Sequence, residues 1–376
     1  MLKRIYPIRL LLLLLLMLPL SARADLREKA EQDVNVKKIV LEHIGNSYEW
    51  HLSSWGGRHI AIPLPVILYS QHSGWHLFSS ARLHHGEEAY NGFRISFEGD
   101  NSGKIVEVLP SGEEVRPWDF SLTKTVVGLW INSAVLLLLI LGVARGYRKR
   151  EIRGDRSAPK GLSGLIEMLI ESLLEEVIRP CIGKNYRRFA PYLLTVFFFI
   201  FVNNLMGLVP FFPGGANVTG NITITLVLAV ATFLAVNLFG TKAYWQEILW
   251  PEVPVWLKAP LPIMPAIEII GLFTKPFALM IRLFANIMAG HAVILILTCK
   301  IFVTVKMGVA VNSSMTVVAL LLSIFMNCLE LLVAYLQAYV FTMLSAVFIG
   351  LAQAEHEHPH PAKNEQTIDY SLTDKN

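Results

Sequence analysis

The chain has 376 residues, of which 53% are hydrophobic and only 16% are charged, whereas a soluble domain carries about 25% charged residues. This composition, with a mean hydropathy of +0.48, indicates a multi-span membrane protein and excludes a disordered chain, a disulfide-stapled secreted scaffold and an ordinary cytosolic enzyme. The net charge of +4 fits loops biased toward Lys and Arg beside anionic lipid better than a nucleic-acid-binding surface.

Residues 1–24 have the pattern of a secretory signal peptide. Basic residues precede the leucine run 10–16, and Ala22-Arg23-Ala24 forms an A-x-A cleavage site. Because the apolar run is too short to span a bilayer, we expect cleavage after Ala24 and a mature N-terminus outside the cytoplasm. The alternative is a short first membrane helix that stays in place.

Residues 25–120 are polar and rich in turns, which predicts a small extracytoplasmic domain. Residues 90–97 and 104–109 alternate loosely between apolar and polar side chains, and the turn sequence GDNSG separates them. This pattern predicts a β-hairpin. We expect exposed histidines here rather than a metal site, because these share no zinc-site spacing: His43, His51, His59, His72, His76, His84 and His85.

The first membrane span is predicted at residues 125–143. A cluster of Lys and Arg follows it up to Lys160, and the positive-inside rule places this loop in the cytoplasm. The signal peptide independently places the other end of the span outside. Two unrelated features therefore predict the same orientation.

The rest of the chain is predicted to be helical. Residues 162–178 have the spacing of an amphipathic helix that lies at the cytoplasmic interface or packs against a partner. Further spans are expected at 192–209, 221–239, 267–297 and 307–351, with an interfacial or re-entrant hairpin at 245–265. The three cysteines lie far apart in or beside apolar segments, and we interpret them as buried small hydrophobic residues: Cys181, Cys299 and Cys328.

The predicted fold class is thus an all-α multi-pass membrane protein with about five transmembrane helices. It has a long, tilted C-terminal helical hairpin and a small N-terminal extracytoplasmic domain with local β structure. The expected parts are a signal peptide (1–24), an extracytoplasmic region (25–120), a membrane domain (121–355) and a cytoplasmic tail (356–376).

Ionisable groups inside apolar spans are costly and usually mark an ion path. In an antiparallel hairpin, facing residues have position numbers with a constant sum. Arg282 with Gln337 and His291 with Glu330 give nearly the same sum, which predicts one hairpin with its apex near residue 310. The structural alternatives are an arginine that extends to the headgroups, and a histidine and a glutamate that only satisfy neighbouring helices.

Three segments resemble subunit a of F-type ATP synthases. Residues 282–291 (RLFANIMAGH) resemble the family's R-L-F-x-N-x-x-A-G segment, and residues 336–341 (LQAYVF) resemble its L-Q-A-[FY]-[IV]-F segment. Residues 204–210 (NLMGLVP) are similar to its N-L-x-G-L-x-P span. The resemblance covers about residues 120–355, and the longer N-terminal region stays unexplained by it.

The resemblance implies a role for each matching residue. Arg282 matches the essential arginine that faces the ring carboxylate, and Asn286 and Gln337 match its polar neighbours. Glu268 matches an acidic position on the cytoplasmic access path.

His291 and Glu330 fall at two positions that some members fill as Glu and His respectively. The exchange keeps one acid and one imidazole, which indicates that the pair carries the function. The pair is expected to line the external half-channel.

The resemblance also implies the partners and the location. The expected partners are the ring of c subunits, the peripheral-stalk b subunits, the remainder of the ATP synthase and the lipid bilayer of a bacterial inner membrane. We expect no nucleic acid, no cofactor, no metal and no catalytic site in this subunit. The alternative is a stand-alone proton-coupled secondary transporter, which predicts inverted repeats that the sequence does not show. The choice between proton and sodium coupling stays open.

Overall fold

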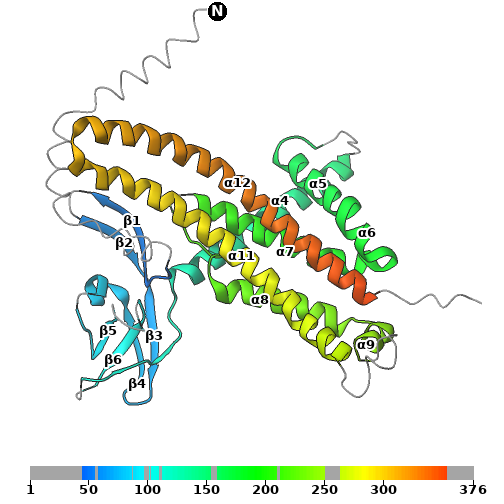
Figure 1. Ribbon diagram of the computed structural model, residues 1–376, viewed down its shortest axis with the longest axis horizontal. Helices are drawn as coiled ribbons and strands as arrows, with labels where there is room; N and C mark the ends of the chain where they lie inside the picture. Colours follow the sequence, from blue (N-terminus) through cyan, green and yellow to red (C-terminus); the bar gives the residue numbers. More distant parts are fainter. Residues whose placement is uncertain are drawn as a thin grey trace, which may run out of the picture.

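The structure is a computed structural model, and it describes residues 45–55, 58–86, 88–96, 101, 103–109, 112–153, 159–209, 212–249 and 263–353. A small β region lies at one end of a long helical bundle (Figure 1). The predicted signal peptide and the C-terminal tail lie outside the described residues.

The β region contains three small antiparallel sheets with strand orders β1-β2, β4-β3-β8 and β5-β6-β7. The predicted hairpin is confirmed, because β5 pairs antiparallel with β6 and places Phe93 opposite Glu107. The strands and the 3-10 helix η2 are β1 (Glu49–Trp55), β2 (Arg58–Pro63), β3 (Pro65–Ser70), β4 (Gly74–Ser79), η2 (Ser80–Gly86), β5 (Phe93–Ile95), β6 (Ile105–Val108), β7 (Glu114–Val115) and β8 (Trp118–Asp119).

This region has a hydrophobic core of its own. Along β3 every second side chain points inward, so that Val66, Leu68 and Ser70 are buried. Phe93 from β5 and Ile105 from β6 complete the centre of the core. The alternation that predicted one hairpin therefore extends over more of the region than the sequence analysis assigned.

The first membrane helix, α4 (Lys124–Arg153), is longer than predicted. It continues for 30 residues and includes most of the basic cluster that we expected to form a loop. Helix α4 contains no proline, and the next proline in the sequence is Pro159. Arg150 and Arg153 in the last turn interact favourably with the negative end of the helix dipole.

The predicted amphipathic segment packs against the chain's own helices. It forms α5 (Leu162–Ser172) and one π-helical turn, η4 (Leu173–Ile178). Its apolar face, including Ile166 and Leu173, belongs to the core of the bundle. The short helix α6 (Arg179–Ile182) and the 3-10 turn η5 (Gly183–Asn185) lead into α7 (Tyr186–Leu208), which carries much of that core.

The next span is short and bent. Helix α8 (Ile222–Leu238) begins with Asn221, whose side chain accepts a hydrogen bond from the backbone N–H of Thr223 at 3.0 Å. It is followed by α9 (Lys242–Leu249) at an angle of 101°. Among the described residues, four helices are long and apolar enough to cross a membrane, or up to five if this bent pair forms one span.

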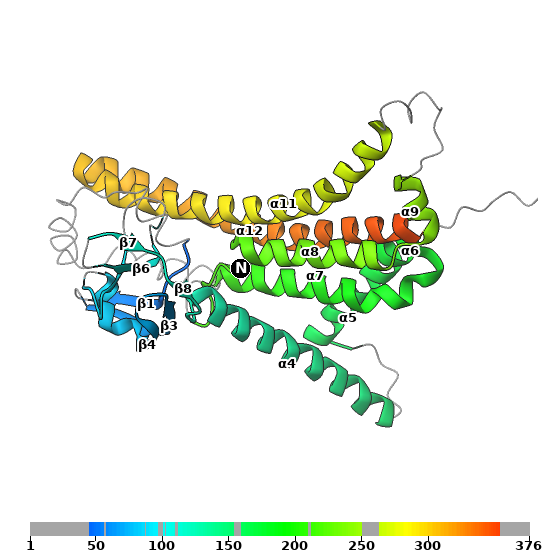
Figure 2. The same ribbon diagram turned by 90° about the horizontal axis from the view of Figure 1, so that it is seen from below.

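Two long helices form the predicted C-terminal hairpin. Helix α11 (Ile263–Val303) has 41 residues and α12 (Val309–Gln353) has 45, which gives lengths of about 60 and 70 Å at 1.5 Å per residue. A bilayer core is about 30 Å thick, so the hairpin must tilt to keep its apolar surface in lipid. Helix α11 continues through Pro276, and Figure 2 shows that it curves at its N-terminal end.

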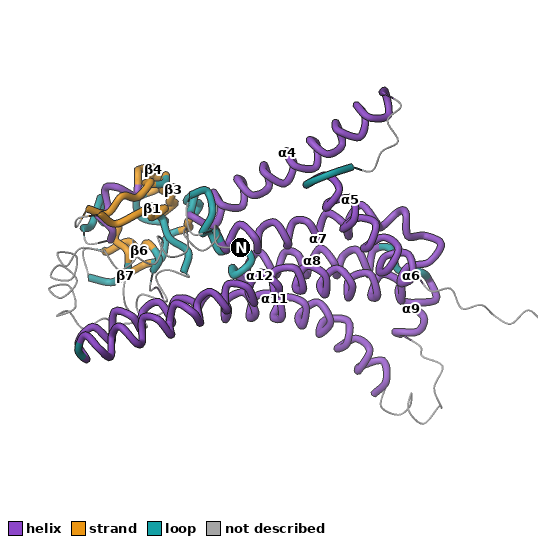
Figure 3. Tube along the Cα trace, turned by 90° about the horizontal axis from the view of Figure 1, so that it is seen from above, coloured by secondary structure: helices purple, strands orange, loops and turns teal. Residues whose placement is uncertain are grey.

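The hairpin turn lies a few residues before the predicted apex. The 3-10 turn η6 (Thr304–Met307) and Gly308, with a φ of 100°, join the two helices. The constant-sum rule assumes that the two helices are in register about the midpoint of the turn. Because the turn lies before the predicted apex, the two helices are displaced from that register along their axes. Helices α7 and α8 run side by side with the two helices of the hairpin, α11 and α12 (Figure 3).

The interpretation of the cysteines as buried residues is wrong for one of them. Cys299 is buried and Cys181 is half-buried, but Cys328 is exposed. It lies on α12 beside exposed apolar residues such as Leu329 and Leu331. On a helix that faces lipid, apolar residues are stable on the outer surface, so an apolar sequence around a cysteine does not show that the cysteine is buried in the protein.

Candidate functional site

His291 and Glu330 face each other across the hairpin, as the sequence predicts. The Nδ1 atom of His291 on α11 lies 2.5 Å from Oε1 of Glu330 on α12, and the two side chains are 17% and 4% exposed. Neither oxygen of Glu330 accepts a hydrogen bond from another group in the part of the chain that the structure describes. The carboxylate therefore depends on the imidazole for its polar contact, since a buried charge without a partner is costly.

Two glycines make room for this pair. A Cβ atom at Gly290 would lie 3.0 Å from Oε1 of Glu330, and one at Gly207 on α7 would lie 3.4 Å from Nε2 of His291. The first distance is tighter than an ordinary van der Waals contact, and the second is at the lower limit of such contacts. The pair therefore lies where α7, α11 and α12 meet, and the helix backbones enclose it.

Arg282 lies on a different face of α11, which the bundle leaves uncovered. Arg282 and Asn286 are exposed, whereas Leu283 and Ile287 are buried against the bundle. The exposed face also carries the small residues Ala278, Ala285 and Ala289, which allow a neighbouring helix to approach closely. Within the described ranges, Arg282 forms no hydrogen bond or ion pair. Among the residues that the structure describes, it is a cation without a counter-charge.

The structure does not join Arg282 to Gln337. Gln337 on α12 is half-buried, and no hydrogen bond links it to Arg282 or Asn286 among the residues described. The predicted hairpin register thus brings together one of its two pairs, because the arginine side chain lies on the outer face of α11.

Buried asparagines near the pair were not assigned a role by the sequence analysis. Asn204 on α7 accepts a hydrogen bond from the Thr219 hydroxyl at 2.6 Å and donates one to the carbonyl of Ala334 at 3.2 Å. Asn132 on α4 donates to Asn203 at 2.9 Å. The signal was present, since an amide inside an apolar span needs a partner. These bonds link α4, α7 and α12 around the site.

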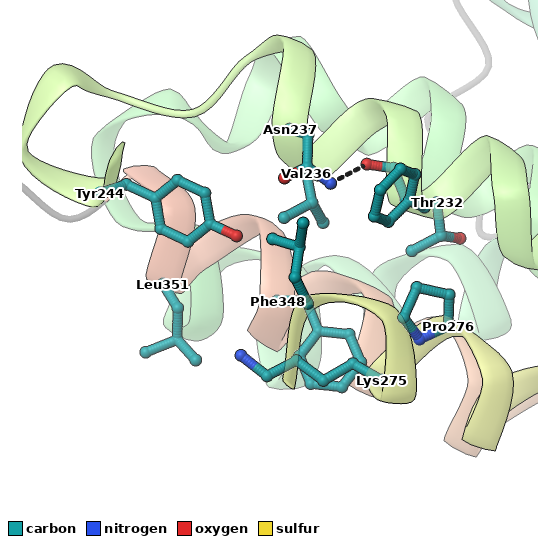
Figure 4. A pocket seen from close by; sticks show the side chains of 10 residues that line it. Thr232, Val236, Asn237, Tyr244, Lys275, Pro276, Phe348 and Leu351 are labelled. Carbon is teal, nitrogen blue, oxygen red and sulfur yellow. Dashed lines mark hydrogen bonds between the residues drawn. The ribbon is translucent and has the colours of Figure 1, made fainter. Parts of the chain in front are cut away.

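A small pocket lies at the other end of the hairpin, between α8, α9, α11 and α12, with a volume of about 20 Å³, which is room for about one water molecule. Figure 4 shows Lys275 and Pro276 at its edge with Thr232, Asn237 and Phe348. The Lys275 amine lies 5.7 Å from the centre of the Phe348 ring. Glu268, about two turns before Lys275 on α11, is half-buried and interacts electrostatically with Tyr244 of the same pocket.

These features define an integral membrane protein with ionisable groups at two separate depths of one helical hairpin. A family model described as ATP synthase A chain matches residues 126–350, and the chain belongs to this family, which is subunit a of the F-type ATP synthases. It is therefore the membrane-embedded proton-channel subunit of such a complex, which also contains the ring of c subunits.

The chain is similar to ATP synthase subunit a of Chloroherpeton thalassium, with 44% identity over 251 residues, which cover 65% of this chain and 70% of the relative. ATP synthase subunit a 2 of Chlorobaculum tepidum is 46% identical over 253 residues, covering 66% and 67%. ATP synthase subunit a of Chlorobium phaeobacteroides (strain DSM 266) is 42% identical over 286 residues, covering 73% and 78%. A second family model, described as a domain of unknown function (DUF8433), matches residues 39–120.

Proposed function

We propose that this subunit is the stator through which protons reach and leave the carboxylates of the c-ring, by way of two aqueous half-channels. The observation that carries the proposal is the exposed, unpaired Arg282 on the small-residue face of α11, in the described part of the chain. A cation in that position is complementary to an acidic group on a closely packed neighbouring helix.

The chemistry of arginine gives the mechanism. Its guanidinium stays protonated at every relevant pH, so Arg282 attracts a deprotonated ring carboxylate and keeps protons from crossing between the half-channels. A ring carboxylate must then be protonated before it turns into lipid, where a bare charge is costly. Each passage of the ring past Arg282 thereby couples rotation to proton transfer.

The His291–Glu330 pair is the proposed proton relay of the external half-channel. The 2.5 Å contact allows a proton to pass directly between imidazole and carboxylate. Burying two ionisable groups costs free energy, so a pair that served only to fill space between the helices would be unfavourable. Asn286 and Gln337, which lie between the pair and the cytoplasmic end, are proposed to orient Arg282 and the ring carboxylate.

The pocket beside Lys275 is the proposed mouth of the cytoplasmic half-channel, with Glu268 next to it. Support comes from the combination of an open space with ionisable and amide side chains between apolar helices. Such a lining gives water and protons a route that the surrounding lipid does not offer.

We further propose a bacterial inner-membrane location, a cleaved signal peptide, an external region 25–120, a cytoplasmic C-terminus, and the b subunits as partners. Cysteine labelling tests the orientation. Ser79→Cys, in the β region, should react with an impermeant thiol reagent in intact cells whose outer membrane admits the reagent. Lys160→Cys should react only after the inner membrane is opened. The opposite pattern would refute both the signal peptide and the positive-inside argument.

Contact with the ring is tested by cross-linking. Ala285→Cys lies on the exposed face of α11, whereas Leu283→Cys, the matched control, replaces a side chain that is 1% exposed. With cysteines scanned along the outer helix of the c subunit, oxidation should give an a–c product for Ala285→Cys and none for Leu283→Cys. Equal products, or none from Ala285→Cys, would contradict the proposed ring-facing surface.

A further inference from the structure

The N-terminal β region is attached to the membrane domain by specific contacts. The side-chain oxygen of Asn46 accepts hydrogen bonds from the backbone N–H of Thr125 at 3.3 Å and from its hydroxyl at 2.8 Å. The backbone N–H of Lys124 donates to the carbonyl of Ser47 at 2.9 Å. A segment far away in the sequence thus caps the N-terminus of α4, which fixes the β region to the first turn of that helix.

Trp50 of β1 extends this attachment to the loop between α7 and α8. Its side chain is 3% exposed and forms a small hydrophobic cluster with Ala216 and Val218 of that loop. Its ring centre lies 5.3 Å from that of Phe212, in an edge-to-face arrangement. Gly128 of α4 closes the cluster, since a Cβ atom there would lie 2.5 Å from Cβ of Ala216.

The backbone of the same loop lies close to His291, next to Gly207. The backbone N–H of Gly215 donates to the carbonyl of Met206 at 3.1 Å, which folds the loop back onto the end of α7. A Cβ atom at Gly207 would lie 3.4 Å from Nε2 of His291 and 3.9 Å from the carbonyl oxygen of Ala216. The loop backbone and the imidazole therefore border the same point.

We propose that the N-terminal β region is a clamp that sets the shape of the external proton entrance. Trp50 acts in it as a positioning residue for the His291–Glu330 pair, through residues 212–221 of the loop between α7 and α8. This inference rests on the proposed function of that pair. It gives a role to a region that the family resemblance leaves unexplained.

The clamp acts on the pair through shape, because the loop by which it reaches the pair carries no titratable side chain. Lys124 is the titratable residue of α4 at the attachment itself. Residues 209–221 and α8 contain no Asp, Glu, His, Lys, Arg, Cys or Tyr. The end of α7 beside the pair contributes Asn204 and Gly207, and the exposed Cys328 is the nearest titratable residue to Glu330 along α12. A displaced loop would change the access of water to His291 and Glu330. The dependence of proton delivery on external pH should change with it.

The test uses the intact complex in inverted membrane vesicles, where the external face of the subunit lies in the lumen. The rate of ATP synthesis is measured against luminal pH at constant membrane potential for Trp50→Ala, Trp50→Phe and Trp75→Ala. Trp75 is the matched control, because it is 67% exposed and its ring contacts are with Tyr69 and Phe120 within the β region. Co-purification of the c-ring reports assembly for each variant.

For Trp50→Ala we expect a complex that assembles. The midpoint of its profile of ATP-synthesis rate against luminal pH should be displaced by about one pH unit, which is a tenfold change in the proton concentration required. Trp50→Phe, which keeps an aromatic ring, should restore most of the profile, and Trp75→Ala should match the wild type. An unchanged profile for Trp50→Ala, or an equal displacement for Trp75→Ala, would overturn the inference. If Trp50→Ala does not assemble, Val218→Ala takes its place with the same criteria.

The proposed function is tested separately, by a variant of Arg282. If Arg282→Ala keeps normal pumping, the channel assignment itself is wrong. If Arg282→Ala abolishes pumping while the Trp50 and Val218 variants keep the wild-type pH profile, the clamp alone is refuted.

Discussion

The facing pair His291 and Glu330 gives a quantitative prediction. At the observed Nδ1–Oε1 separation of 2.5 Å, two opposite unit charges attract by up to about 7 kcal/mol at an effective dielectric constant of about 20. Desolvation of both groups reduces the net value, and breaking a buried pair by removing one partner costs about 3–5 kcal/mol. Because a factor of ten corresponds to about 1.4 kcal/mol, a cost of this size corresponds to about 10²–10⁴-fold, and each single exchange should slow proton delivery by at least about 100-fold.

The perturbation is a complete double-mutant cycle with His291→Glu, Glu330→His and the double exchange. The double exchange restores one acid and one imidazole at the same contact, and we expect a rate within about tenfold of the wild type. Independent effects of about 100-fold each would multiply to about 10⁴, so the expected coupling is about 4 kcal/mol.

The assay is ATP-driven proton pumping in inverted vesicles, normalised to the amount of assembled complex. Asn327→Ala is the control, because Asn327 lies one turn from Glu330, is exposed, and donates only to the Ser323 carbonyl of its own helix at 2.8 Å. If the double exchange is as slow as the product of the two single exchanges, the two residues act independently and the relay is refuted.

Gln337→Leu and Asn286→Leu should each slow pumping by at most about tenfold, since each removes a single polar partner worth about 1 kcal/mol; abolished pumping in the same vesicle assay would show that these amides do more than orient. In the β region, burial alone would raise the pKa of Glu107, but hydrogen bonds from Ser70 and Ser73, together with His72 and His76, outweigh it and hold that pKa below its usual value. A carboxylate with a depressed pKa stabilises the fold above its unfolded pKa of about 4.3 and loses this contribution as the pH falls through the folded value. Glu107→Gln should therefore increase hydrogen exchange in β5 and β6 at pH 7. It should also reduce the further increase in exchange that acidification below a pH of about 4.3 causes in the wild type. Exchange equal to that of the wild type both at pH 7 and in acid would contradict this role.

Much of the membrane architecture was predictable because lipid imposes long apolar helices. The spans near α7, α8, α11 and α12 follow directly from hydropathy. The position of the basic cluster on α4 was less predictable, since charge bias reports the side of the membrane and says little about where a helix ends.

The contact between His291 and Glu330 was predictable from the sequence, because both are ionisable residues in apolar helices and the hairpin register brings them together. The separation of Arg282 from Gln337 was not, because it depends on which face of α11 packs against the bundle. The attachment of Trp50 to the α7–α8 loop was also beyond reach. It joins residues far apart in the chain through shape, with no charge or motif to mark them.

The most direct test of the account is proton pumping by complexes with a changed Arg282. Arg282→Ala removes the fixed cation, and Arg282→Lys replaces it with an ammonium that can lose its proton when it is buried. Lys300→Ala, which removes an exposed cation farther along α11, is the control. We predict that both Arg282 variants assemble with the c-ring but pump no protons, while Lys300→Ala pumps normally. Normal ATP-driven pumping by either Arg282 variant would contradict the central claim that this arginine separates the two half-channels.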